Sequence, residues 1–253
     1  MVRLSLNSSP LFYWGDIHGK WEVLVDKKYA DCNILQVGDF NMGFNSNDIE
    51  RLGYLNDFLS NHNIFLYIIR GNHDDPFYFS GDFLNKWSNI KLLPDYTILD
   101  YYGKIILCVG GAISINRMVE IELQKKTGLV RWFSGEKFNY RNDVVIDIAS
   151  TYNIDVVVTH SSPMSFYPDN SGGYPDIVSQ YFEKDPCLIS ELNEERNVHQ
   201  IFLDTLISVG NKPKQWIYGH FHTSQRSYYN GVEGVLLGIN EFHDSRLDIE
   251  END

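Results

Sequence analysis

"IIRGNHDDP", residues 68–76, is the stretch around which the rest of the sequence can be organised. It ends the apolar run "NIFLYIIR" (63–70) with a glycine and then four polar side chains, Asn72, His73, Asp74 and Asp75. Gly, Asn and Asp supply turn geometry and local hydrogen bonds, so a strand followed by a polar turn explains the stretch as well as a functional site does. The neighbouring sequence has to separate these two interpretations.

Four other stretches repeat the design of an apolar run that stops at a small residue and then presents Asp or His. They are "LFYWGDIHG" (11–19), "NILQVGDF" (33–40), "IDVVVTHSSP" (154–163) and "QWIYGHFH" (215–222). Short runs rich in Val, Ile, Leu and aromatic residues, bounded by turn formers, are typical of buried strands. The sequence therefore predicts five strands that each end in metal-ligating residue types.

Two segments between these runs have helical periodicity. Residues 48–62 place Ile49, Leu52, Leu55 and Leu59 at helical spacing, and residues 190–210 repeat the pattern and end at Gly210, a typical helix terminator. Strands that alternate with helices form sheets covered by helices, and ligands bind beyond the carboxyl ends of the strands. The fold should gather on one rim Asp16, His18, Asp39, Asn72, His73, His160, His220 and His222.

Length and composition favour one globular domain, residues 1–253. The chain is 43% apolar and 14% aromatic, and it has no Pro/Gly/Ser-rich linker. We expect a soluble protein, because no apolar run is long enough to span a membrane and the first residues lack a secretory core. Its three cysteines form no CxxC pair, which favours a reducing, cytoplasmic setting over a disulfide framework or a cysteine metal site.

The formal net charge of −13 argues against a nucleic-acid partner. Phosphate backbones are bound mainly through Lys and Arg. A bound divalent metal would reverse the field locally, however, and attract a phosphate group whatever the net charge. Carboxylates, imidazoles and an amide oxygen are ligands for such metals, and a bridging carboxylate lets two cations share one site.

The motifs GDIHG, GDF, RGNHD, TH and GHFH, in this order, resemble those of the calcineurin-like metallophosphoesterases, and most closely their bacterial and phage members. The resemblance extends from about Phe12 to about Gly238. It implies a two-sheet mixed β-sandwich flanked by helices, in the α/β class, and a hydrolase with two divalent transition-metal ions. Manganese is the first choice, with iron, zinc, nickel and cobalt as alternatives.

Carried over residue by residue, the resemblance assigns the first metal to Asp16, His18, Asp39 and His222. It assigns the second metal to Asp39, Asn72, His160 and His220, so that Asp39 bridges the two ions. His73 stays off the metals as the general acid. A water that bridges the two cations would lose a proton near neutral pH and attack phosphorus, while His73 protonates the departing alkoxide.

Two arginines are candidate substrate ligands. Arg70 either approaches the phosphate or pairs with a carboxylate. "CVGGAISINR" (108–117) resembles an element of bacterial and phage members, in which Arg117 approaches the site with Trp132 and Glu136 behind it. The alternative is a tight turn with Arg117 facing solvent.

Several polar residues in or near the motifs have less specific roles. His62, His199 and His243 fall outside the motifs, and we expect them at surface or helix positions. Asp74 and Asp75 either orient His73 or a ligand histidine, or they stabilise the turn.

Departures from the family narrow the function. Serine/threonine protein phosphatases have a second motif similar to GDxVDRG, whereas Met42 and Gly43 stand here at the Asp and Arg positions. A phosphate mono- or diesterase is therefore favoured, acting on a phosphorylated small molecule, nucleotide or phosphopeptide. The alternatives are a protein phosphatase or nuclease of the same superfamily, a non-catalytic scaffold, or an unrelated dinuclear hydrolase. Substrate choice is expected to depend on the segments 112–142 and 163–187.

Overall fold

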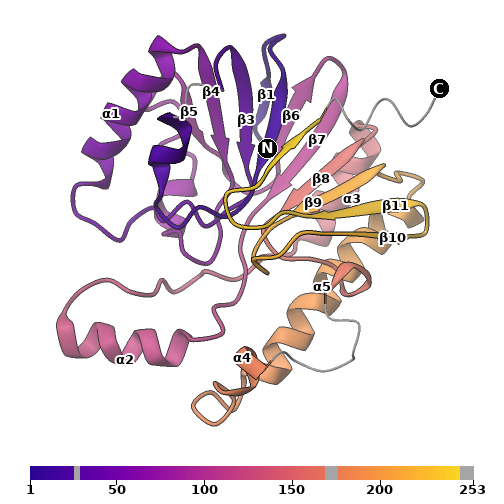
Figure 1. Ribbon diagram of the computed structural model, residues 1–253. Helices are drawn as coiled ribbons and strands as arrows, with labels where there is room; N and C mark the ends of the chain where they lie inside the picture. The colour runs from indigo at the N-terminus through magenta and orange to yellow at the C-terminus, as the bar shows by residue number, and fades with distance from the viewer. Residues whose placement is uncertain (26–28, 169–175, 246–253) are drawn as a thin grey trace.

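The computed structural model describes residues 1–25, 29–168 and 176–245, which form two β-sheets packed face to face with helices on the outside (Figure 1). The strands are β1 (Arg3–Ser5), β2 (Leu11–Trp14), β3 (Cys32–Gln36), β4 (Ile64–Ile68), β5 (Ile90–Leu92), β6 (Thr97–Tyr101), β7 (Lys104–Val109), β8 (Val156–Thr159), β9 (Gln215–Tyr218), β10 (Gln225–Tyr229), β11 (Val232–Leu236) and β12 (Phe242–Asp244). The α-helices are α1 (Asp48–Asn61), α2 (Arg117–Thr127), α3 (Asn142–Thr151), α4 (Asp176–Ser179) and α5 (Leu188–Ser208). Short 3-10 helices are η1 (Trp21–Val25), η2 (Pro76–Phe79) and η3 (Met164–Phe166).

Both sheets are mixed. Among the described residues, one has the strand order β1-β6-β7-β8-β9-β11-β10, with antiparallel pairs only at β6–β7 and β10–β11. The other has the order β12-β2-β3-β4-β5, parallel apart from its edge strand β12. The predicted two-sheet mixed α/β fold is thereby confirmed.

Apolar side chains fill three layers. The central layer lies between the sheets and joins residues such as Leu35 and Val37 of one sheet region to Ile106 and Val158 of the other. A second layer packs α1 on the outer face of the five-stranded sheet, and a third packs α3 and α5 on the outer face of the seven-stranded sheet (Figure 1). Strands buried on both faces have continuous apolar sequences, which is why the runs lack polar alternation.

The predicted elements occur close to their expected positions. The five apolar runs contain β2, β3, β4, β8 and β9, and the two helical segments are α1 and α5. Gly210 has a positive φ of 81° and donates its N–H to Ile207 O just after α5, as expected of a residue that ends a helix.

The five motif strands belong to two different sheets. β2, β3 and β4 lie in the five-stranded sheet, whereas β8 and β9 lie in the seven-stranded sheet. The single rim of the sequence prediction is therefore built from the carboxyl ends of strands in two sheets that pack face to face.

The expectation for the three remaining histidines needs one correction. His62 ends α1 and His199 lies on α5, as expected of helix positions, although His199 is fully buried. His243 is neither exposed nor helical, because it lies in β12 and is buried. Its ring stacks at 6.2 Å on Tyr13 of the neighbouring strand β2, and this pairing between distant segments has no local sequence signal.

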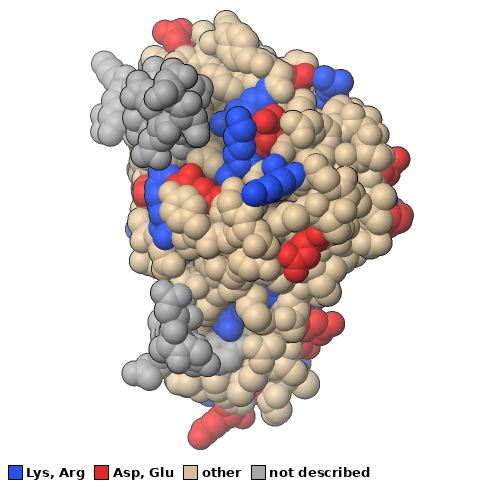
Figure 2. All heavy atoms as spheres, turned by 90° about the vertical axis from the view of Figure 1, so that its right-hand side faces the viewer, with Lys and Arg blue, Asp and Glu red and all other residues tan. Residues whose placement is uncertain are grey.

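No helix among the described residues is long and apolar enough to cross a membrane. Lys and Arg side chains gather on the face shown in Figure 2, although the formal net charge is −13.

Candidate metal centre

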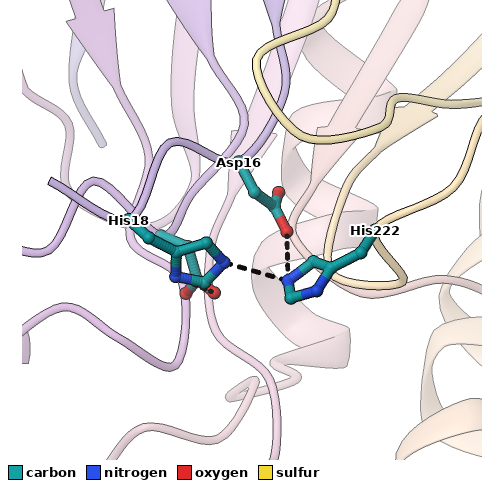
Figure 3. Close-up of side chains that lie close together, drawn as sticks. Asp16, His18 and His222 are labelled. Atoms are coloured by element: carbon teal, nitrogen blue, oxygen red, sulfur yellow. Dashed lines mark hydrogen bonds and ion pairs between the residues drawn. The ribbon is translucent and has the colours of Figure 1, made fainter. Parts of the chain in front are cut away.

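Loops that follow three strands bring four predicted ligands together. One ligand atom each from Asp16, His18, Asp39 and His222 lies within 4.8 Å of the others. Figure 3 shows Asp16 and His18, from the loop after β2, and His222, from the loop after β9, pointing toward one another. His18 Nε2 is 2.9 Å from His222 Nε2, which lies 3.4 Å from Asp16 Oδ2.

A second group of ligand atoms adjoins the first through Asp39. His160 Nδ1 lies 2.8 Å from Val37 O, so this nitrogen carries a proton, and in the neutral imidazole Nε2 presents its lone pair. Nε2 lies 3.1 Å from Asn72 Oδ1 and 3.2 Å from Asp39 Oδ1. The His220 ring is centred 5.1 Å from the His160 ring. Every residue predicted for the second metal is therefore near this group.

The chemistry of these atoms fits a divalent cation. A carboxylate oxygen, an amide oxygen and an imidazole nitrogen with its lone pair turned inward repel one another at about 3 Å unless a positive charge lies among them. Oxygen and imidazole ligands of this kind are those that Mn, Fe, Zn, Ni and Co accept. The residues present thus fit the two metals that the sequence predicts.

Burial and mutual charge strongly perturb the ligands in the metal-free chain. Burial lowers the pKa of His18 to about 4 and raises the pKa of Asp16 to about 7. Burial opposes the charged form of His160, but the Asp39 and Asp16 carboxylates outweigh it and raise the pKa of His160 to about 10. A proton on His160 would then occupy the place suited to a metal, and the same negative field would favour a cation there.

Four of the proposed ligand residues have a left-handed backbone conformation, which residues other than glycine rarely adopt. His18, Asp39, His220 and His222 have φ values of 46°, 60°, 73° and 55°. Each such left-handed residue costs about 1–3 kcal/mol, and such strain persists where the surrounding structure holds it in place, commonly at functional sites.

Two motif glycines are required by close approach to the ligand carboxylates. A Cβ at Gly71 would lie 2.2 Å from Asp39 Oδ1, and one at Gly219 would lie 2.1 Å from Asp16 Oδ1. These two glycines therefore leave room for a ligand carboxylate from another motif.

His73 lies beside the ligands and faces a cavity. Its backbone N–H donates to Asp39 Oδ1 at 2.8 Å, and its ring is centred 5.2 Å from the His18 ring. The ring lines a cavity that Asp39, Asn72 and His222 also line. Placed there, the imidazole could reach a substrate that contacts the metal ligands.

The neighbours of His73 have structural roles. Asp74 accepts N–H groups of Gly71, Phe40 and Met42 at 2.8, 3.1 and 2.9 Å, which ties the second and third motifs together. Asp75 caps η2 through Phe77 N. Of the two roles considered for these aspartates, turn stabilisation is the one that these hydrogen bonds support.

Both candidate arginines are engaged in ion pairs. Arg70 pairs with Asp95 at 2.8 Å and donates to the carbonyl groups of residues 135–137, which is the structural alternative considered above. Arg117 is buried and pairs with Asp185 and Glu191, so it does not face solvent as the simple turn interpretation expected. These contacts join long connections to the body of the fold.

Sequence reasoning gave no positioning role to Ser114 or Glu136. Ser114 Oγ donates to Glu136 Oε2 at 2.6 Å and accepts from Asn72 Nδ2 at 2.9 Å. Because Glu136 takes the hydroxyl proton, the serine oxygen is left to accept, and the Asn72 amide oxygen is turned toward His160. Both residues occur in the segment 112–142, but their separation of 22 residues leaves no local pattern.

Comparisons with known proteins agree with the geometry. A model of the family described as calcineurin-like phosphoesterase matches residues 11–224. An uncharacterised protein, L509, of Acanthamoeba polyphaga mimivirus is 30% identical over 78 residues, which cover 30% of this chain and 23% of that protein.

Two solved structures are also similar. A putative 5'-nucleotidase from Staphylococcus aureus, in complex with alpha-ketoglutarate, gives a TM-score of 0.47 at 14% identity over 92% of this chain and 49% of its own. The phosphopantetheinyl hydrolase PptH from Mycobacterium tuberculosis gives a TM-score of 0.45 at 14% identity over 92% of each chain. The chain thus spans less than a quarter of the viral protein and about half of the staphylococcal one.

Proposed function

The chain belongs to the calcineurin-like phosphoesterase family, and we propose on that premise that it hydrolyses phosphate mono- or diesters with two bound divalent metals. The observation that carries the proposal is the pair of adjoining ligand groups that share Asp39. In one group, Asp16, His18 and His222 surround this carboxylate. In the other, His160 Nε2 lies 3.1 Å from Asn72 Oδ1 and 3.2 Å from Asp39 Oδ1.

The proposed ligand sets follow from this geometry. Asp16, His18, Asp39 and His222 hold one metal, and Asp39, Asn72, His160 and His220 hold the other. Distances within each set support these assignments, and the position of Asp39 between the sets supports its role as the bridge. Manganese is the first choice among the metals that such ligands accept.

When bound, the two cations would supply a water activated for attack on phosphorus and would neutralise charge on the phosphate oxygens. The proposed role of the chain's own side chains is to hold the metals and to protonate the leaving group. In hydrolysis a new bond forms between the water oxygen and phosphorus, and the bond from phosphorus to the ester oxygen breaks. His73 gives its proton to the departing oxygen, which leaves as an alcohol.

Metal content and activity test the proposal together. Protein stripped with a chelator and reconstituted with Mn²⁺ should contain two metals per chain and hydrolyse at least one ester in a panel of phosphomonoesters, phosphodiesters, cyclic nucleotides and phosphopeptides. Activity should disappear on chelation and return with metal. Only trace metal after reconstitution, or two bound metals with no hydrolysis of any ester, would contradict it.

A further inference from the structure

The metal centre opens into a cavity of about 320 Å³, of which the proposed mechanism uses only the end at the metal ligands. Its size is typical of sites for small molecules. His73, His220 and His222 line it at the metal centre, and side chains from α4, α5 and the loop before α2 line it further away. A group attached to a phosphate at the metals could therefore extend into this space beside the proposed general acid.

One part of the lining is aliphatic and held in place by its own packing. Val178 and Leu192 line the cavity and belong to a small hydrophobic cluster with Ile113 and Leu188, against which Ile115 also packs. This cluster is separate from the three main layers of the core. A packed cluster of this kind presents a preformed apolar surface.

Another part of the lining is aromatic. Tyr167 and Phe221 line the cavity with their rings 5.0 Å apart in an edge-to-face arrangement. Phe221 lies between the two histidines of the GHFH motif, and its ring is centred 5.0 Å from that of His220. The aromatic surface is therefore continuous with the metal centre.

Polar side chains in the lining are largely engaged with neighbours. Ser161 Oγ donates to Glu195 Oε1 at 2.8 Å, and the Arg196 guanidinium lies 3.4 Å from the centre of the Tyr167 ring. Asn116 Nδ2 donates to Glu120 Oε1 at 3.0 Å. Glu195 Oε2 is buried without a hydrogen-bond partner, but the other contacts engage much of the polar lining, and the surface left for a ligand is mainly apolar.

We propose that this cavity receives the alcohol part of the substrate, and that the preferred substrates are small phosphate esters whose alcohol part carries an uncharged aromatic ring. The proposal rests on the proposed function and adds a substrate class to it. A preformed apolar pocket favours a compact ring over the extended backbone of a polypeptide or nucleic acid. His73 is then placed next to the ester oxygen of the same alcohol.

A matched pair of phosphonates tests the proposal without requiring hydrolysis. We would titrate Mn²⁺-loaded protein with 2-phenylethylphosphonate and with ethylphosphonate, which differ only in the ring, and measure both dissociation constants by calorimetry. Burial of the ring, offset by the cost of ordering it, should tighten binding about 10- to 100-fold. The corresponding phosphate esters, whose alkoxides differ little as leaving groups, should show a similar preference in kcat/KM.

Two variants on α5 assign the preference to the cavity. Leu192→Trp fills the apolar part of the cavity and should reduce the preference for the ring to about twofold or less. Ile201→Trp adds the same side chain on the same helix at a position that is 51% exposed, and it should keep the preference of the wild-type protein. Thermal unfolding of both variants checks that they fold. Should Leu192→Trp not fold, Ile115→Trp in the loop before α2 takes its place.

The outcomes separate the two proposals. Hydrolysis of both esters with equal affinity for the two phosphonates overturns the aromatic pocket and leaves the proposed function intact. A ring preference that survives both Leu192→Trp and Ile115→Trp also overturns it. Failure to bind either phosphonate overturns the aromatic pocket, whereas the proposed function is contradicted only if no ester of the panel described above is hydrolysed.

Discussion

Replacing Ser114 with alanine should weaken one of the two metal sites and leave the other intact. Ser114 touches no proposed metal, but it accepts the 2.9 Å hydrogen bond from Asn72 Nδ2. Its own proton goes to Glu136 at 2.6 Å, and Glu136 also accepts the backbone N–H of Ser114 at 3.1 Å. Alanine removes the acceptor, and the Asn72 amide is then free to rotate and turn its NH₂ group toward His160.

The size of the effect follows from these contacts. A buried amide that loses its partner costs about 1–3 kcal/mol. Residues that orient metal ligands typically contribute 10- to 100-fold to metal affinity, which is about 1.4–2.7 kcal/mol. We therefore expect the affinity for the second Mn²⁺ to fall about 10- to 100-fold, with little change at the site of Asp16, His18 and His222.

Calorimetric titration of metal-free protein with Mn²⁺ measures both affinities. Glu136→Gln should weaken the same site. The glutamine amide can donate to Ser114 as well as accept from it, so the serine oxygen is no longer reserved as an acceptor for Asn72. Glu120→Gln makes the same charge change in the same connection and should leave both affinities unchanged. Ser190→Ala removes an exposed hydroxyl that donates to Cys187 O and serves as the second control.

The Asn72→Asp background tests the mechanism directly. A carboxylate has no NH₂ group to misdirect, so adding Ser114→Ala to Asn72→Asp should cost less than threefold in affinity, about half a kcal/mol. An equal loss in both backgrounds would refute the orientation argument, as would unchanged affinity for both metals in Ser114→Ala.

Three further results are expected. His73→Asn should slow hydrolysis of an alkyl ester about 10²- to 10⁴-fold in steady-state assays and have little effect on a p-nitrophenyl ester, whose phenolate leaves unaided; loss of a metal would instead make His73 a ligand. Asp39→Asn should reduce the content of both metals, and His222→Ala mainly that of one, by elemental analysis; two retained metals with normal turnover in Asp39→Asn would show that Asp39 is not the bridge. Burial raises the pKa of Glu195 from 4.5 to about 7, so its contribution to stability is present below about pH 4.5 and is lost as the pH rises through about 7. In urea unfolding of the metal-free protein, Glu195→Gln should therefore abolish on the order of 3 kcal/mol or less of the fall in the free energy of unfolding with rising pH. Identical pH profiles for the wild-type protein and the variant would contradict this expectation.

Local sequence patterns were sufficient to predict the five motif strands and two helices, and to propose side chains that the structure places near one another. β2, β3, β4, β8 and β9 are short and largely buried on both faces, so their sequences are mostly apolar and are followed by small residues. Ligands bind at the carboxyl ends of such strands, and Asp16, Asp39 and His160 lie within three residues of the ends of their strands. The close approach of Gly71 to Asp39 and of Gly219 to Asp16 explains the glycine at these two positions.

Other features depend on contacts between segments far apart in the chain. The division of the five motif strands between two sheets, the pairing of Arg70 with Asp95 and the burial of His243 against Tyr13 required the tertiary structure. The same is true of Ser114, because its partners Asn72 and Glu136 are 42 and 22 residues away. Periodicity and turn residues report the conformation of a few neighbouring residues, whereas these contacts exist only after sheet packing brings the long connections against the ends of the strands.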